Sequence, residues 1–462
     1  MTRETSVLSG AGTASPARPL QVAAASLVGT AVEWYDFFLY GSAAALIFGR
    51  LFFPSTDPAA GTLLAFGTYA VGFVARPLGG IVFGHFGDKV SRKKMLVFSL
   101  LLMGIATFVI GLLPTYATIG VWSPVLLLLC RLAQGFAAGG EWGGAVLITA
   151  EQGDDDRRGF WSSWPQAGVP LGNLLSAAVL WLMSAVLSQE AFQAWGWRIP
   201  FLLSAVMVAV GLWVRLRIEE SPVFAASREA AARQEHRRAP LVEVFRSYKR
   251  EIVIAIGLRL AENISYYIFT IVVITYSVTY LGLPDQMAIS AVLFASIAQF
   301  FLTPAMGALS DRLGRRPVYL AGAVGAGAWG FAFFPLLDTA NLAVTTAAIF
   351  IGLIFNSMMY APQAALFSEL FGTSVRYSGT SFASQAGSVL AGGLAPLISV
   401  ALLGSVQDKN SLGVSIYLAV AAAITSVAVL ACKETARSSL THDRTLTYDG
   451  APGDPLHEET AR

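Results

Sequence analysis

Charged residues are scarce in this chain of 462 residues, at 13%, whereas hydrophobic residues make up 55%. Soluble domains typically carry about 25% charged residues, so the composition excludes an ordinary water-soluble fold. The chain has only two cysteines, Cys130 and Cys432, which excludes a disulfide framework and offers no metal-ligand spacing. Its net charge of +2 is too close to neutral to indicate binding to nucleic acid.

Long apolar runs alternate with short charged stretches along the chain. A run of about 20 apolar residues crosses a hydrocarbon core of ~30 Å as a helix, and the alternating pattern of barrel strands is absent. We therefore predict an all-α integral membrane protein with twelve transmembrane helices. They lie near residues 22–50, 60–84, 95–113, 123–150, 160–187, 197–216, 251–281, 287–309, 317–336, 341–367, 378–404 and 411–432.

Lysine and arginine are distributed very unevenly between the two sides of these spans. With both termini in the cytoplasm, the cytoplasmic segments hold 25 of the 31 basic residues and the external segments hold three, namely Arg50, Arg198 and Lys409. Cytoplasmic loops are the ones enriched in basic residues. The count therefore predicts a multi-pass protein of the plasma (inner) membrane with both termini cytoplasmic.

One long polar stretch interrupts the apolar spans and divides them into six plus six. Nine basic residues lie between Arg215 and Arg250, and this stretch predicts short amphipathic helices on the membrane surface. The polar ends of the chain predict disordered cytoplasmic tails, and the first nineteen residues lack the regions of a signal peptide. The predicted division is a tail over 1–20, an N-terminal bundle over 21–216, a linker over 217–250, a C-terminal bundle over 251–432 and a tail over 433–462.

Two cytoplasmic motifs occur once in each half. The loop after the second span reads GHFGDKVSRKK over residues 84–94, and the loop after the eighth reads GALSDRLGRR over residues 307–316. Glu151 is followed seven residues later by Arg158, and Glu369 is followed seven residues later by Arg376. These collinear matches indicate a duplicated six-helix unit, the architecture of transporters that rock two bundles about a central site.

The repeated loop, with its spacing of Gly, Asp and Arg, resembles the signature loop of the major facilitator superfamily. Further segments resemble its metabolite:proton symporter family, which includes permeases for shikimate, α-ketoglutarate, citrate and proline/betaine, and shikimate-permease-like members are the most similar. Ser91 departs from the glycine that is usual in the loop. The segments are EWYDFFLYG (33–41), FVARPLGG (73–80), GGEWGG (139–144), WGWRIP (195–200), EESP (219–222) and RLAE (259–262).

Seven charged residues fall inside predicted spans, where each costs roughly 2.5–3.5 kcal/mol if it faces lipid. They must therefore face protein or a water-filled cavity, and helical spacing places them on shared faces. The resemblance implies a major facilitator fold of two six-helix bundles, whose central cavity is lined by spans one, four, seven and ten. The seven residues are Glu33, Asp36, Arg76, Arg131, Glu141, Arg259 and Glu262.

Arg131 and Arg259 are the predicted binding groups for an anionic substrate, because a guanidinium offers a planar fork that fits a carboxylate. The alternative is that the arginines form structural ion pairs, which we favour for Arg76. The other predicted substrate-binding residues share faces with these charges or carry a hydroxyl near them. They are Tyr40, Gln134, Glu141, Asn263, Tyr266 and Tyr360.

The four acids in the spans outnumber the three arginines, so at least one carboxylate lacks a full cationic partner. Such a carboxylate can load and unload a proton. We predict that Asp36 or Glu33 is the proton carrier, followed by Glu262.

A cytoplasmic latch is implied for the repeated loops, where acidic and basic residues close the outward-facing state. An alternative is that the loops only carry topology signals, which explains their basic residues but not the repeated aspartate. The predicted gating residues are Asp88, Arg92, Glu151, Arg158, Asp311, Arg315, Glu369 and Arg376.

Together these features predict a proton-coupled symporter that imports a small organic acid, and not an enzyme. No nucleotide-binding loop, metal cluster or nucleophile–base motif is present in the sequence, so we expect no catalytic residue, metal or cofactor, and the proton gradient as the energy source. The expected partners are an organic anion, H⁺ and membrane lipid, with the chain as a monomer and without nucleic acid. The alternatives are uptake of a zwitterionic osmolyte such as proline or betaine, a transporter-like sensor, drug export by proton antiport, and coupling to sodium.

Overall fold

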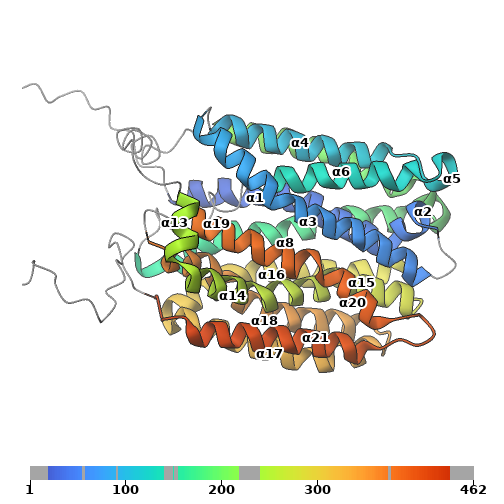
Figure 1. Ribbon diagram of the computed structural model, residues 1–462. Helices are drawn as coiled ribbons and strands as arrows, with labels where there is room; N and C mark the ends of the chain where they lie inside the picture. Colours follow the sequence, from blue (N-terminus) through green and yellow to red (C-terminus); the bar gives the residue numbers. More distant parts are fainter. Residues whose placement is uncertain are drawn as a thin grey trace, which may run out of the picture.

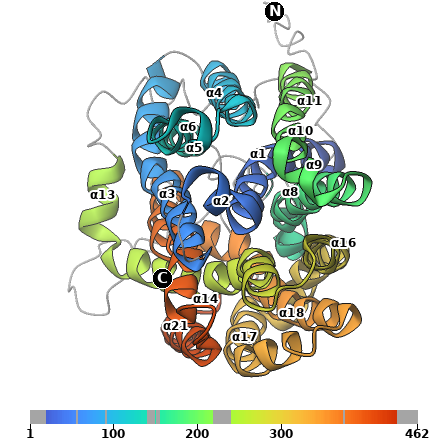
Figure 2. The same cartoon turned by 90° about the vertical axis from the view of Figure 1, so that its right-hand side faces the viewer.

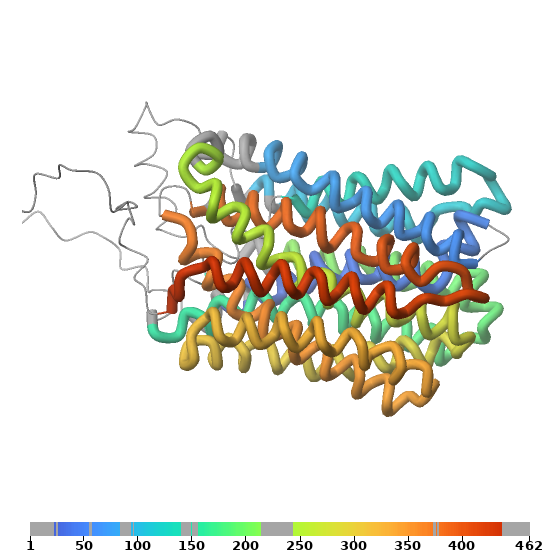
Figure 3. Tube along the Cα trace, turned by 60° about the horizontal axis from the view of Figure 1, so that its bottom comes forward, coloured from blue at the N-terminus to red at the C-terminus, as the bar shows by residue number. Residues whose placement is uncertain are grey.

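The computed structural model of the chain describes residues 19–54, 58–89, 92–139, 149, 155–217, 240–372 and 376–436. Every regular element within these ranges is a helix. Most of the helices run side by side along one common direction (Figure 1, Figure 3). The first eighteen residues, most of the predicted linker and the chain after residue 436 lie outside the described residues.

The first six predicted spans are helical wherever the structure describes them. The first span continues from α1 (Pro19–Ala43) through a π-helical turn, η1 (Ala44–Phe48), into α2 (Gly49–Phe52). The other helices of this half are α3 (Pro58–Lys89), α4 (Arg92–Leu112), α5 (Tyr116–Ile119), α6 (Trp122–Ala138), η2 (Asp155–Arg157), α8 (Arg158–Val186), α9 (Gln189–Ala191), η3 (Phe192–Gly196), α10 (Arg198–Leu202) and α11 (Ser204–Arg217).

The second half follows the same plan after a short helix of the linker, α13 (Pro240–Ser247). Its seventh span alternates between α-helical and π-helical turns. The helices are α14 (Lys249–Tyr267), η4 (Ile268–Val272), α15 (Val273–Thr275), η5 (Tyr276–Tyr280), α16 (Asp285–Leu313), α17 (Arg315–Leu337), α18 (Leu342–Leu370), α19 (Arg376–Gly387), η6 (Ser388–Gly393), α20 (Ala395–Leu403) and α21 (Ser411–Ala431).

Nine helices among the described residues are long and apolar enough to cross a membrane. The first span and the shorter apolar helices of the third and fourth spans bring the number to the predicted twelve. The fourth predicted span, 123–150, is described as helix only as far as Ala138 and again at Thr149. The prediction of twelve helical spans is thus confirmed.

The twelve spans form two bundles of six, as predicted. In the first bundle α6 packs against α3 and α4, and in the second α18 packs against α16 and α17. Figure 2 views the helices end-on, with the blue-to-green first half above the yellow-green-to-red second half. The bundles meet along two lines, where α8 packs against α16 and where α3 packs against η6 and α20.

Glycines allow α3 and α6 to approach each other at backbone distance. A Cβ atom on Gly135 of α6 would overlap the carbonyl oxygen of Gly72, and one on Gly79 of α3 would overlap the carbonyl oxygen of Phe136. Small residues of this kind are how membrane helices gain close van der Waals contact without a hydrophobic driving force. The backbone of α3 is thereby held close to α6, and α3 carries one of the seven in-span charges, Arg76.

Residues 433–436, which the sequence assigns to the C-terminal tail, lie within the described residues. Glu434 and Thr435 of this segment form side-chain hydrogen bonds with Arg315 and Glu369. The rest of the predicted tail lies outside the described residues.

Replacing Gly79 by alanine should destabilise the protein, because the new methyl group forces α3 and α6 apart. Overpacking of this kind typically costs about 1–3 kcal/mol. The matched control is Gly67→Ala on the same helix, where an added Cβ meets nothing within 4 Å. Thermal unfolding in detergent should show a lower Tm for Gly79→Ala alone; equal Tm values for the two variants would contradict the close approach.

Candidate functional site

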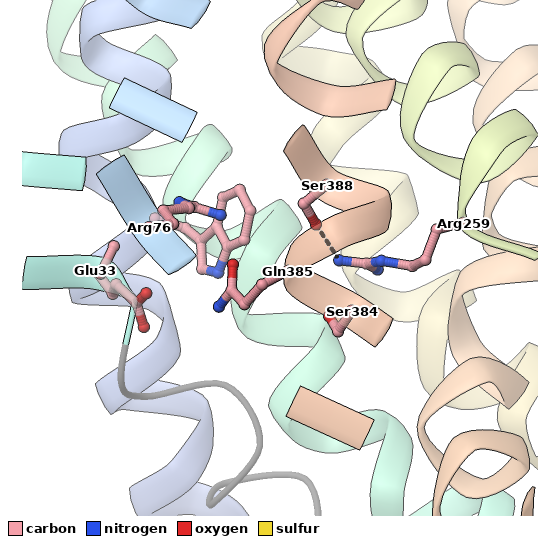
Figure 4. A pocket seen from close by; sticks show the side chains of 8 residues that line it. Glu33, Arg76, Arg259, Ser384, Gln385 and Ser388 are labelled. Atoms are coloured by element: carbon pink, nitrogen blue, oxygen red, sulfur yellow. Dashed lines mark hydrogen bonds between the residues drawn. The ribbon is translucent and has the colours of Figure 1, made fainter. Parts of the chain in front are cut away.

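A small cavity with about 10 Å³ of free space lies between the two bundles. Figure 4 shows Glu33 and Arg76 on one side of it, Arg259 and Ser388 on the other, and Gln385 between them. Pockets for drug-sized ligands enclose roughly 300–1,000 Å³, so the cavity is nearly closed in this conformation and must widen to hold a solute. Its lining consists of Glu33 and Trp34 of α1, Arg76 of α3, Ala138 of α6, Arg259 of α14, Ser384 and Gln385 of α19, and Ser388 of η6.

A connected hydrogen-bond network surrounds Arg259 on the second-bundle side of the cavity. Its Nη1 donates to Glu262 Oε2 at 3.0 Å and to Gln363 Oε1 at 2.5 Å, and its Nη2 donates to Ser388 Oγ at 2.8 Å. The Glu262 carboxylate also accepts a bond from Asn263 Nδ2 at 2.9 Å. Arg259 and Glu262 are each only 4% exposed, so this is a buried ion pair whose two charges offset each other.

Arg76, on the first-bundle side, is surrounded by aromatic rings. Its guanidinium carbon lies 5.1 Å from the ring centre of Trp34, 4.0 Å from that of Phe37 and 4.5 Å from that of Phe73. The side chain is buried, and its Nε and Nη2 atoms have no hydrogen-bond partner among the described residues. The ion pair that the sequence favoured for Arg76 is likewise absent from the described part of the chain.

Arg131 lies in a separate aromatic enclosure outside the lining of this cavity. Its guanidinium carbon is 4.0–4.4 Å from the ring centres of Phe37, Tyr40 and Tyr69. Nη1 donates to Gln134 Oε1 at 3.1 Å, and Gln134 donates in turn to the Thr107 hydroxyl at 2.7 Å.

Asp36, one of the predicted proton carriers, is buried in the same region. Thr107 interacts with its carboxyl group by hydrogen bonding, and Arg131 interacts with it through its charge. Its Oδ1 atom has no hydrogen-bond partner among the described residues. The first bundle therefore holds a second acid–arginine group that lies apart from the cavity lining.

The predicted tyrosines lie around the cavity and not in its lining. Tyr40 bonds the Thr68 hydroxyl at 2.6 Å, and the backbone carbonyl of Tyr360 accepts a bond from Gln166 across the bundles at 3.2 Å. The ring of Tyr266 packs against Phe38 of the opposite bundle at 5.4 Å between centres. The bond of Gln166 and the ring contact of Tyr266 thus join the two bundles, whereas the Tyr40 bond lies within the first bundle.

The structure brings two of the predicted site residues, Glu33 and Arg259, into the cavity lining. Asn263 and Glu262 contact Arg259 or its partners behind the lining, and Glu141 lies outside the described residues. Sequence reasoning missed Ser384, Gln385 and Ser388 as site residues. Ser384 and Ser388 are spaced by one helical turn on the eleventh span, with Gln385 beside Ser384, so the sequence places the three near one helix face. The prediction considered mainly charged residues and therefore did not include them.

Four of the predicted gating residues form a buried cluster at the end of the bundles where α8 and α17 begin. Arg158 of the first bundle contacts Glu369 of the second at 2.9 Å, and both side chains are fully buried. Arg315 lies 2.7 Å from Asp311 and 3.6 Å from Glu369.

Asp311 also reaches across the bundle interface, where it accepts bonds from the backbone N–H groups of Gly159 and Phe160 at 2.8 and 2.9 Å. These groups begin helix α8, so the acid caps a helix of the opposite bundle.

The segment after α21 adds two contacts to this cluster. The Thr435 hydroxyl donates to Glu369 Oε2 at 2.6 Å, and Glu434 accepts bonds from the backbone N–H groups of Arg315 and Arg316 at the start of α17. Partial burial raises the pKa of the Glu434 carboxyl, but the backbone N–H donors together lower the pKa below its usual value.

The remaining gating residues are not part of this described cluster. Arg376 is buried and bonds the carbonyl oxygen of Phe371 at 3.4 Å. The side chains of Asp88 and Arg92, and all of Glu151, lie outside the described residues.

The chain is similar to bacterial transport proteins over nearly its whole length. It is 41% identical to the shikimate transporter of Escherichia coli (strain K12) over 430 residues, which cover 92% of this chain and 97% of that protein. It is 42% identical to the inner membrane metabolite transport protein YhjE of the same organism, over 91% of this chain and 95% of the relative. The proline/betaine transporter of Salmonella typhimurium (strain LT2) is 37% identical, over 91% and 84%.

A solved structure of the proton:xylose symporter XylE, bound to 6-bromo-6-deoxy-D-glucose, superposes with a TM-score of 0.71 over 91% of this chain and 97% of that chain. At 17% sequence identity, this likeness concerns the fold alone. The pattern of the Major Facilitator Superfamily matches residues 26–396. The chain therefore belongs to the major facilitator superfamily, and it is a multi-pass membrane transporter and not an enzyme.

Proposed function

We propose that this protein is a proton-coupled symporter that imports a small organic acid through the cavity between its bundles. The observation that carries this proposal is a cavity between the bundles whose lining holds two arginines and one acid. Lipid would reject an organic anion, whereas guanidinium groups inside the membrane make it bindable. The relatives named as transporters of shikimate and of other metabolites support this substrate class.

Proton coupling requires a carboxylate that changes its charge as the transporter changes its conformation. Glu33 lines the cavity beside Arg76, and Asp36 lies one helical turn further along α1. When either acid is protonated, the two arginines of the first bundle, Arg76 and Arg131, outnumber its remaining described in-span carboxylate. The resulting net positive charge favours the binding of an anion. Glu262 is less suited to this task because it is tied to Arg259 and Asn263.

A zwitterionic solute is the second candidate. Glu33 and Arg76 lie in the same cavity, so one solute can place a cationic group near the acid and a carboxylate near the arginine. The 37% identical relative named as a proline/betaine transporter supports this alternative. The two candidates differ in the net charge of the solute that moves.

Alternating access in this proposal depends on the cytoplasmic cluster as a latch. The contacts of Arg158 with Glu369, and of Asp311 with the start of α8, join the bundles and must break when the cytoplasmic side opens. The proposed bundles span residues 21–216 and 251–432, and the protein functions as a monomer of the inner membrane with both termini in the cytoplasm. The excess of basic residues in the cytoplasmic segments supports this orientation.

Uptake into proteoliposomes under an imposed pH gradient tests the proposal. Labelled shikimate should accumulate above its external concentration when the lumen is alkaline, and a protonophore should abolish the accumulation. Glycine betaine, proline and dicarboxylates complete the panel. Binding of one of these solutes without uptake would replace the proposal by the sensor alternative.

The variant Asp36→Asn should lose accumulation driven by the proton gradient and keep exchange of labelled for unlabelled solute. An amide cannot carry the proton, but it occupies the same space as the carboxyl group. Asp285→Asn, at the external end of α16, is the matched control and should accumulate solute normally. Accumulation against a gradient by Asp36→Asn would exclude Asp36 as the carrier.

The variant Glu369→Gln should weaken the closed cytoplasmic side, because Arg158 then lacks its acid. Removing one partner of a buried ion pair typically costs about 3–5 kcal/mol. A Ser163→Cys reporter, placed where α8 faces Gly307 of α16, should react faster with a maleimide in a background without Cys130 and Cys432. Glu251→Gln, whose acid has no ion pair among the described residues, is the control; equal labelling rates in both variants would argue against the latch.

A further inference from the structure

We propose that Arg76 is the residue that grips the substrate carboxylate. This inference rests on the proposed function, which places the substrate in the cavity between the bundles. Neither the sequence-based prediction nor any of the comparisons assigns Arg76 to binding. Three observations carry the inference: the bonding state of the three in-span arginines, their position relative to the cavity, and the groups around Arg76.

The three arginines differ in how far their hydrogen-bonding capacity is already used. Arg259 donates to Glu262, Gln363 and Ser388, so its guanidinium is largely occupied by the protein itself. Arg131 donates to Gln134 and also has two nitrogen atoms without a hydrogen-bond partner among the described residues, but it is enclosed by three rings and does not border the cavity. Arg76 lines the cavity, is 4% exposed and has two nitrogen atoms without a hydrogen-bond partner in the described part of the chain.

Aromatic rings alone do not satisfy a buried guanidinium. The rings of Trp34, Phe37 and Phe73 attract the cation and fix its orientation, but they accept no in-plane hydrogen bond from its N–H groups. Donors that are buried without acceptors destabilise a structure, and they are retained where a ligand supplies the acceptor. A carboxylate has two oxygen atoms at the spacing of the guanidinium fork and fits that requirement.

The neighbours of Arg76 indicate what the rest of the solute looks like. Gln385 carries an Oε1 atom without a hydrogen-bond partner in the described residues, and with Ser384 it lines the same cavity. These uncharged groups suit hydroxyl or amine groups of a solute. Glu33 disfavours a second carboxylate by charge repulsion, so the substrate class is a solute with one carboxylate and uncharged or cationic groups elsewhere.

Binding measured by titration calorimetry on the full chain in nanodiscs tests the role of Arg76. The probes are shikimate and its methyl ester, which share the ring and its hydroxyl groups and differ in the ionised carboxylate against the neutral ester. If shikimate does not bind, the probes are glycine betaine and choline, which differ in a carboxylate against a hydroxymethyl group. Wild-type protein should prefer the carboxylate form by about 100-fold, as expected for charge-assisted bonds. In Arg76→Gln this preference should fall to a few-fold, and Arg76→Lys, which keeps the charge without the fork, should lie between them.

Two controls separate binding from folding. Arg198→Gln removes a half-buried arginine that bonds only backbone carbonyls at the external end, and it should keep the wild-type preference. Thermal unfolding should confirm that Arg76→Gln remains folded. The ratio of the affinities for the carboxylate probe and for its neutral analogue does not depend on the fraction of active protein. An unchanged ratio in Arg76→Gln would overturn the role of Arg76 while the proposed function stands. Wild-type protein that binds none of the panel carboxylates would overturn both.

Discussion

The cost of holding ionised side chains inside an apolar layer governs how this protein is built. Each in-span charge must find a partner, an aromatic surface or a cavity, because lipid offers none of these. The described charges accordingly lie inside the bundles or between them, and Arg131 and Arg158 are completely buried. Because burying a charge in the membrane raises the free energy of the folded protein, a charge is retained there only where a contact or a function offsets that cost. The position of such a charge therefore indicates where contacts or ligand sites lie.

The two bundles meet this constraint in different ways. In the second bundle Arg259 and Glu262 form a pair that is supported by Gln363 and Ser388, and its charges offset each other. In the first bundle Arg76 is held by ring faces and leaves donors free. A duplicated architecture has thus produced one side where the arginine is paired with an acid and one side where the arginine has hydrogen-bond donors left for a charged solute.

The cluster of Arg158, Asp311 and Glu369 shows the same physics, and the proposed alternating access requires its contacts to be reversible. Asp311 binds two backbone N–H groups of the opposite bundle, and Arg158 binds Glu369, so charge-assisted bonds bridge the interface. Close glycine contact between Gly159 and Gly307 lets α8 and α16 approach until these bonds are short. Polar bonds at one end and aromatic packing near the centre together hold the bundles around the cavity.

The sequence by itself determined the twelve spans and the set of in-span charges, because the ~30 Å apolar layer imposes a length and a polarity that are local properties of the chain. Its repeated motifs also determined the six-plus-six duplication. Only the tertiary structure decided which of these charges share a cavity. It joined Glu33 and Arg76 to Arg259, separated Arg131 from them, and added Ser384, Gln385 and Ser388. The sequence did not predict this grouping, because helical spacing shows only which residues share a face of one helix. The register and tilt between the two bundles depend on glycine contacts and cross-bundle hydrogen bonds, which no single segment encodes.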